Sequence, residues 1–141
     1  MEKSKDKLFI NGVKVYLENI EYKSTDINNI QIKISQNLDL VSCNKDMIII
    51  RMTRRIMSDK TDDFKLIVSS IGEFHLEERS MNNFKNLDEM EKYANERMGY
   101  IIDKVQMGSV MSQIIANVTG TFGRPPIILP AVINEDTFKK D

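Results

Sequence analysis

The first half of the chain alternates apolar and polar residues in four stretches, a pattern typical of β-strands with one covered face. In the first stretch, residues 8–24, the apolar positions change parity near Glu18 and Asn19. Because successive side chains of a strand point to opposite faces, this change predicts a bulge, a twist or a change of face in mid-strand.

Residues 30–40, 48–57 and 64–76 form the other three stretches, separated by polar turn segments. The last of them alternates over thirteen residues and is the clearest strand of the chain. Gly72 lies in its interior and predicts a bulge or a close approach of the backbone to another group. Four strands joined by short turns predict an antiparallel sheet.

The second half of the chain has the periodicity of helices. Residues 87–97 predict a short acidic helix, followed by a break at Gly99. Apolar residues then recur at three- and four-residue steps from Met98 to Val118, which predicts a main helix that ends near Gly120. Helices that follow all the strands segregate to one face of a sheet, so we expect an α+β fold: a four-stranded antiparallel sheet with a long helix packed on one face.

Length and composition favour one intracellular domain. The chain has 141 residues, which predicts a single domain over 1–141, with 1–7 and 139–141 as flexible ends. Cys43 is the only cysteine, so a reducing, cytoplasmic setting is the simpler expectation. The net charge is −1 with acids and bases mixed, and no segment has the length of a membrane span, so we expect neither nucleic-acid binding nor membrane insertion.

Three segments carry recognisable motifs. Residues 16–23 read Tyr-Leu-Glu-Asn-Ile-Glu-Tyr-Lys, residues 67–74 read Ile-Val-Ser-Ser-Ile-Gly-Glu-Phe, and after the main helix come Gly-Thr-Phe and then Leu-Pro-Ala-Val at 129–132. All three resemble motifs of the bacterial export chaperone SecB. The first resembles the family's Tyr-x-Lys-Asp-Ile-Ser-Phe-Glu, and the second resembles Glu-Val-Gln-Gln-Ala-Gly-Ile-Phe. The third resembles Gly-Thr-Phe-Pro followed by Leu-Ala-Pro-Val. The resemblance covers most of the chain, roughly residues 14–138.

The resemblance implies an ATP-independent chaperone, assembled as a dimer of dimers through sheet and helix contacts. Such a chaperone holds non-native polypeptides in apolar grooves, protein export being one setting for it, and uses neither catalysis nor a cofactor. The family's two acidic positions for docking the SecA motor fall here on Asn19 and Lys23, and the residues 139–141 do not match its acidic tail. Contact with SecA is therefore left open.

A holding chaperone needs an adaptable apolar surface, and nine methionines and six phenylalanines supply suitable side chains. We expect isoleucines of the second strand to form one wall of the groove and the C-terminal segment to form another, with Phe138 matching a groove phenylalanine of the family. The alternative is that these side chains form the core. The expected groove residues are Ile30, Ile32, Ile34, Phe122, Ile127, Leu129 and Phe138.

Small residues recur every four positions in the main helix, at Gly108, Ser112 and Ala116. Residues four apart share a helix face, so this row allows another helix to approach closely. We expect it to form an oligomer interface. The alternative is that the row fits against the chain's own sheet.

Other chemistry is poorly supported. His75 has no neighbouring ligand or base, which favours a surface or structural role, and Cys43 has no histidine near it in sequence. Arg51, Arg54 and Arg55 form the one basic cluster. Pairing with phosphates or with an acidic client is the alternative, but cross-strand pairing with Glu73, Glu77 and Glu78 is expected. We therefore expect no enzyme and no metal site. The alternative to a general chaperone is a dedicated chaperone or interaction module for one partner, such as an antitoxin or a mobile-element protein.

Overall fold

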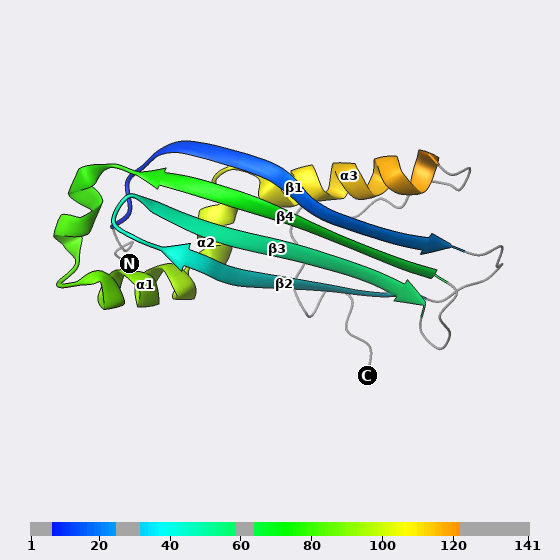
Figure 1. The fold of residues 1–141 in the computed structure, drawn as a ribbon, viewed down its shortest axis with the longest axis horizontal. Coiled ribbons are helices and arrows are strands. Elements are labelled where there is room, and N and C mark those ends of the chain that lie inside the picture. The colour runs from blue at the N-terminus through cyan, green and yellow to red at the C-terminus, as the bar shows by residue number, and fades with distance from the viewer. Residues whose placement is uncertain (1–6, 25–31, 59–63, 122–141) are drawn as a thin grey trace, which may run out of the picture.

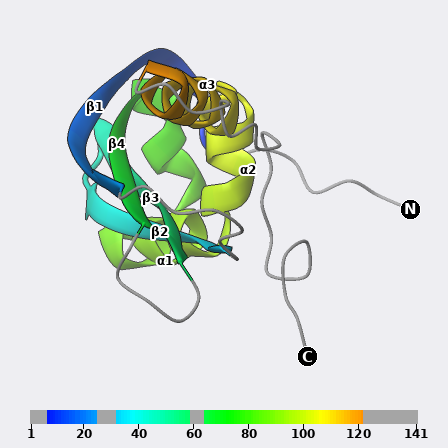
Figure 2. The same ribbon diagram turned by 90° about the vertical axis from the view of Figure 1, so that its right-hand side faces the viewer.

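The computed structural model describes residues 7–24, 32–58 and 64–121. Four strands, β1 (Ile10–Ser24), β2 (Ile32–Cys43), β3 (Met47–Ser58) and β4 (Phe64–Leu76), form one antiparallel sheet in the order β1-β4-β3-β2. The helices of this part of the chain all lie on one face of the sheet (Figures 1 and 2). The α+β fold predicted from the alternation is confirmed.

The helices cover different parts of that face. A 3-10 helix, η1 (Glu78–Asn83), leads into α1 (Leu87–Glu96), α2 (Met98–Asp103) and α3 (Met107–Thr121). α1 packs beside β2 and α3 over β4, as seen along the sheet in Figure 2. The Asn86 side chain caps α1 by accepting a hydrogen bond from the backbone N–H of Glu89 at 2.9 Å, which fixes where the acidic helix begins.

The predicted irregularity of the first strand is confirmed. The β1–β4 register shifts between Leu17 and Asn19, so Glu18 is an extra residue in β1. A bulge of this kind bends the strand and lets its apolar positions stay on one face despite the change of parity. Leu17 and Ile20 consequently lie opposite Ser70 and Val68, whose side chains share the helix-covered face.

The core lies between the helices and the even-numbered side chains of β3 and β4, from Ile48 to Ile56 and from Phe64 to Leu76. Gly72 is one of these positions and makes the predicted close approach. A Cβ there would lie 2.8 Å from Cε2 of Phe74 and 3.2 Å from Sδ of Met107. The register on both sides of Gly72 is regular, so Gly72 does not form a bulge. It leaves space for the Phe74 ring of β4 and for Met107 of α3.

The prediction of one long main helix is wrong. The first break falls at Arg97 and not at Gly99, and a second turn, residues 104–106, separates α2 from α3. Gln106 has a φ of 55°, a left-handed conformation that ends a helix. Periodicity missed this break because Ile102 and Met107, on either side of it, are both buried.

Candidate functional site

A buried arginine joins α3 to the sheet. Arg54 of β3 is 0% exposed and points to the helix-covered face. Its Nε donates a hydrogen bond to Oε1 of Gln36 on β2 at 2.7 Å, and its Nη1 donates to Oγ of Ser112 on α3 at 2.7 Å. Burial lowers the pKa of the guanidinium to about 10, which leaves it protonated at neutral pH.

The small-residue row of α3 lies on the side that faces β3 and β2. Ser112 makes the bond to Arg54, Gly108 is buried and Ala116 is half-buried. Next to the row, Ser70 of β4 donates a hydrogen bond to Sδ of Met111 at 2.9 Å. At Ser112 the row thus contacts the chain's own sheet, and its role between copies of the chain stays a prediction.

Two of the expected groove residues lie on the helix-covered face of the edge strand β2. Ile32 is 39% exposed, and Ile34 is half-buried beside the core, across from Ile56. They precede Gln36 on the same face of β2, so the three side chains form a row that ends at the hydrogen bond between Gln36 and Arg54. The other expected groove residues, Ile30, Phe122, Ile127, Leu129 and Phe138, lie outside the described residues.

An apolar strip on the other edge was not anticipated from the sequence. On the helix-covered face of β1, Val13, Leu17 and Ile20 are 36–45% exposed, and Val110 of α3 is 37% exposed. Val110 is on the flank of α3 away from Ser112, and α3 runs beside β1 (Figure 1). We call these four residues the β1 strip. Exposed apolar side chains gathered on one edge are typical of contact surfaces.

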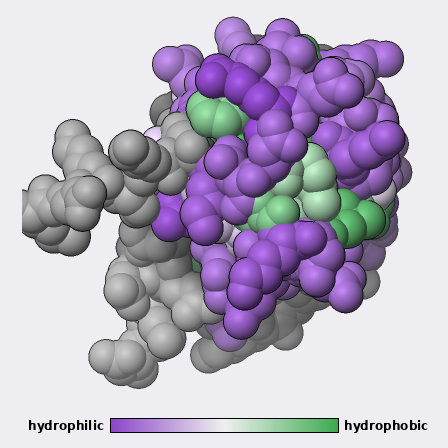
Figure 3. Space-filling view, turned by 90° about the vertical axis from the view of Figure 1, so that its left-hand side faces the viewer, coloured by the Kyte–Doolittle hydropathy of each residue, from purple (hydrophilic) through white to green (hydrophobic). Residues whose placement is uncertain are grey.

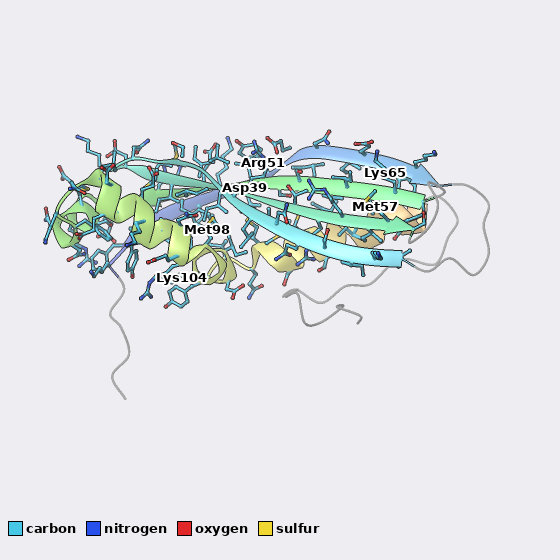
Figure 4. The ribbon with its side chains drawn as sticks, turned by 90° about the horizontal axis from the view of Figure 1, so that it is seen from below. Asp39, Arg51, Met57, Lys65, Met98 and Lys104 are labelled. Carbon is cyan, nitrogen blue, oxygen red and sulfur yellow. The ribbon has the colours of Figure 1, made fainter. Side chains whose placement is uncertain are left out.

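The uncovered face of the sheet carries ion pairs. Nε and Nη2 of Arg51 bind the two carboxylate oxygens of Glu18 at 2.7 and 2.9 Å, and Lys65 pairs with Glu21 at 2.6 Å. Figure 4 shows Arg51 and Lys65 on this side, away from the helices. The hydrogen bonds from Arg51 lower the pKa of Glu18. Glu18 is the extra residue of the β1 bulge, and from there its side chain reaches across β4 to Arg51 on β3.

The predicted basic cluster is therefore wrong. Arg54 points to the opposite face from Arg51 and Arg55, because side chains alternate along β3. Two of the three expected glutamate partners also have other partners. Glu73 accepts a hydrogen bond from the Tyr16 hydroxyl at 3.0 Å, which raises the pKa of Tyr16, and Glu77 pairs with Arg79 at 2.8 Å.

The remaining titratable candidates do not form a reactive site. Burial, and next the negative charge of Glu91, raises the pKa of Cys43 to about 11, so the thiol is protonated at neutral pH and is a weak nucleophile. His75 is exposed on β4. Within residues 7–24, 32–58 and 64–121, histidine, cysteine, aspartate and glutamate form no group of three or more that could hold a metal ion. No helix of that same part is both long and apolar enough to span a membrane.

No family model and no curated protein matches the chain. Among solved structures, the SecB-like chaperone of Mycobacterium tuberculosis, in complex with a ChAD peptide from the HigA1 antitoxin, superposes with a TM-score of 0.54. The match covers 89% of this chain and 88% of that chain at 9% identity. The fold is SecB-like.

A second solved structure, a protein of unknown function from Streptococcus agalactiae, covers 85% of this chain and 99% of that chain at 14% identity. Its TM-score is 0.33, which is too low to indicate a shared fold. In the part of the chain that the structure describes, the four strands precede the helices, and β1 and β2 are the two edges of the sheet.

Proposed function

We propose that the protein is an ATP-independent SecB-like chaperone that binds non-native or extended polypeptides in apolar grooves and keeps them from aggregating. The observation that carries the proposal is the SecB-like fold, which matches a chaperone over 89% of the chain. That chaperone is in complex with an antitoxin peptide, so its fold accommodates a bound polypeptide. The protonated Cys43 and the solitary His75 agree with a binding protein better than with an enzyme.

The client site lies on the helix side of β2. Ile32 offers exposed apolar surface there, and Ile34 continues it toward α3. Full burial of one large apolar side chain is worth about 1.5–3 kcal/mol, whereas micromolar binding needs about 8 kcal/mol plus the cost of ordering the client. Several contacts must act together, and the C-terminal residues Phe122, Ile127, Leu129 and Phe138 supply the others in this proposal.

The protein assembles with itself through sheet and helix contacts. The β1 strip supports this part of the proposal, because an edge strand with exposed apolar side chains on one face is suited to pairing with a second copy. We do not propose that the protein delivers clients to SecA through a carboxylate dock. Asn19 is exposed and uncharged, and Lys23 is cationic, at the two positions where the family is acidic.

A matched pair of variants tests the client site. Ile32→Ser removes an apolar side chain from the helix side of β2, whereas Lys33→Ser changes its neighbour on the uncovered face. A denatured model enzyme is diluted into buffer without ATP, and its aggregation is followed by light scattering. We expect the wild-type protein and Lys33→Ser to suppress aggregation, and Ile32→Ser to bind the client roughly fivefold more weakly, equivalent to about 1 kcal/mol.

Aggregation that proceeds unchanged with the wild-type protein would contradict a general chaperone. If Ile32→Ser and Lys33→Ser had equal effects, the chaperone function would stand, but the client site would not lie on the helix side of β2. Suppression confined to a single client protein would favour the dedicated-chaperone alternative.

A further inference from the structure

β2 is one edge of the sheet, and within residues 7–24, 32–58 and 64–121 it pairs with β3 alone. In an antiparallel sheet, every second residue of an edge strand points its backbone N–H and C=O groups away from the sheet. These groups form hydrogen bonds with water or with an added strand. The outer side of β2 therefore presents backbone donors and acceptors next to the apolar side chains of Ile32 and Ile34.

The two edge strands differ in where their bulges lie. The pairing of β1 with β4 shifts at Glu18, in the middle of the strand. The pairing of β2 with β3 is unbroken from Ile32 to Leu40 and shifts only at Val41, near the end of the strand. A bulge interrupts the regular spacing of the backbone groups, so a long added strand fits β2 better than β1.

Proline and charged side chains that point inward are two devices by which soluble proteins protect an edge strand from pairing. The unbroken part of β2 contains no proline. Its charged side chains, Lys33 and Asp39, point to the uncovered face. Its helix-side residues are all uncharged: Ile32, Ile34, Gln36, Leu38 and Leu40. An approaching strand therefore meets no charged side chain of β2 on the helix side.

Among the described residues, the helices leave the first half of β2 open. α1 packs beside β2, and the negative charge of Glu91 acts on Cys43 at the end of the strand. Figure 4 views the molecule from the β2 edge and shows α1 next to the part of β2 beyond Asp39. Figure 3 views the end at which β2 finishes, where one apolar band interrupts a mainly hydrophilic surface. Ile32, which is 39% exposed, begins the strand at the opposite end.

An added strand would complete the burial of this edge. Ile34, Leu38 and Leu40 pack against the core but are only half-buried. Side chains that lie opposite each other on neighbouring strands are close enough to touch, so apolar residues at every second position of an added strand would cover this row. The residues between them would face water, as Lys33 and Ser35 do on β2. A partner that fits this edge therefore alternates apolar and polar residues.

We propose that a client segment adds to β2 as a fifth strand along Ile32–Leu40, with apolar side chains at every second position on the helix side. The inference rests on the proposed chaperone function and names the non-native segments that it binds. These segments are extended, alternate apolar and polar residues, and lack proline in the paired stretch. Hydrogen bonds between the main chains give affinity for many sequences, and the alternation gives selectivity.

Fluorescence anisotropy with N-methylated peptides tests the strand addition. The parent peptide is end-capped, is as long as the unbroken part of β2, and alternates valine with threonine or lysine. One derivative carries N-methyl groups on valines, and the other carries an equal number on threonines and lysines. Only one of these two sets of N–H groups points toward β2 in an added strand. We expect one derivative to bind at least roughly tenfold more weakly than the parent, and the other to bind within about twofold of it.

Hydrogen exchange, read residue by residue by nuclear magnetic resonance, locates the added strand. Between Ile32 and Leu40, we expect the amides that point toward β3 to exchange slowly in the free protein, and the alternate amides to exchange quickly. The parent peptide should slow the exchange of the second set by roughly tenfold or more. The amides of β1 serve as the control, because the proposal leaves their exchange unchanged.

Two lysine substitutions on opposite faces of β2 form a matched pair. Ile32→Lys places a charge on the helix side, against the apolar side chains of the added strand, and Ser35→Lys places the same charge on the uncovered face. Both positions are exposed, so we expect both variants to fold. We expect Ile32→Lys to weaken binding of the parent peptide roughly tenfold, and Ser35→Lys to change it by less than about twofold.

Several results would overturn the proposal. These are equal effects of the two methylations, equal effects of the two lysine variants, and unchanged exchange in β2. Slow exchange of both amide sets in the free protein would also overturn it, because the edge would then already be paired. A peptide of the same composition with all its valines in one block must bind more weakly than the alternating one. Binding of an unfolded model protein is measured in parallel: if it persists while these tests fail, only this inference fails, and if the wild-type protein binds neither, the proposed function fails as well.

Discussion

Arg54 and Arg51 lie three residues apart on β3 but on opposite faces of the sheet, and their surroundings differ. Arg54 is completely buried and hydrogen-bonds to the uncharged side chains of Gln36 and Ser112. Arg51 has a side chain that is 36% exposed and binds the Glu18 carboxylate with two hydrogen bonds. One arginine is therefore part of the packing of α3, whereas the other belongs to a hydrated ion pair.

The difference shows how each face keeps its shape. An exposed ion pair contributes little stability, because water already solvates both groups well. A buried charge is costly to leave without hydrogen bonds, so Arg54 constrains where Ser112, and with it α3, lies over the sheet. The helix side is fixed by directional contacts beneath α3. Exposed apolar side chains lie along both sheet edges, at Ile32 of β2 and in the β1 strip.

The largest expected effect is at Arg54. Arg54→Ala removes a buried side chain and leaves Gln36 and Ser112 without this donor, so we expect the free energy of unfolding to fall by about 2–4 kcal/mol. Urea unfolding followed by circular dichroism measures it. A loss below about 1 kcal/mol would mean that Arg54 is not an anchor for α3.

Glycines on the two faces give the next comparison. Gly72→Ala places a methyl group 2.8 Å from Phe74 Cε2 and should cost about 1–3 kcal/mol through overpacking. Gly12→Ala is the control. It lies across from His75, and its methyl group would meet nothing closer than 3.7 Å, so we expect a change within about 0.5 kcal/mol. Thermal unfolding of both variants measures the difference. Equal shifts in the unfolding temperature would contradict the tight packing around Gly72.

The smallest effect is expected at Arg51. Arg51→Ala should lower the free energy of unfolding by at most about 1 kcal/mol, and less at high salt. Arg51 depresses the pKa of Glu18 below its ordinary value of 4.5. The stabilisation is therefore present above the unfolded-state pKa and is lost as the pH falls through the lower folded-state pKa. As the pH falls from neutral to acidic, the free energies of unfolding of the wild-type protein and Arg51→Ala should converge. A difference that stays constant with pH would refute the ion pair.

Much of the sheet could be predicted because its signals are local. The alternation from Phe64 to Leu76 fixed the bounds of β4, and the parity change at Glu18 revealed the bulge. The space reserved at Gly72 was also foreseeable, because a glycine inside a strand loses packing and needs a reason. These features depend on a residue and its immediate neighbours along the chain.

The helix boundaries and the polar contacts could not be predicted in the same way. The break at Gln106 requires a φ that periodicity does not encode, and η1 is too short to show a period. Arg54 has the parity of Ile50 and Met52, a signal for the covered face, but its partners come from β2 and α3 and depend on tertiary packing. Of the expected groove residues, Ile32 and Ile34 are placed, and the others lie outside the described residues.

The proposed chaperone function is tested most directly by native mass spectrometry of the purified protein. The protein is titrated with a reduced, unfolded model protein and, separately, with the native form of that protein. We expect an oligomer that forms complexes with the unfolded form only, and the spectrum also gives the number of clients per assembly. Binding to neither form, or to both forms equally, would contradict a chaperone that selects non-native chains.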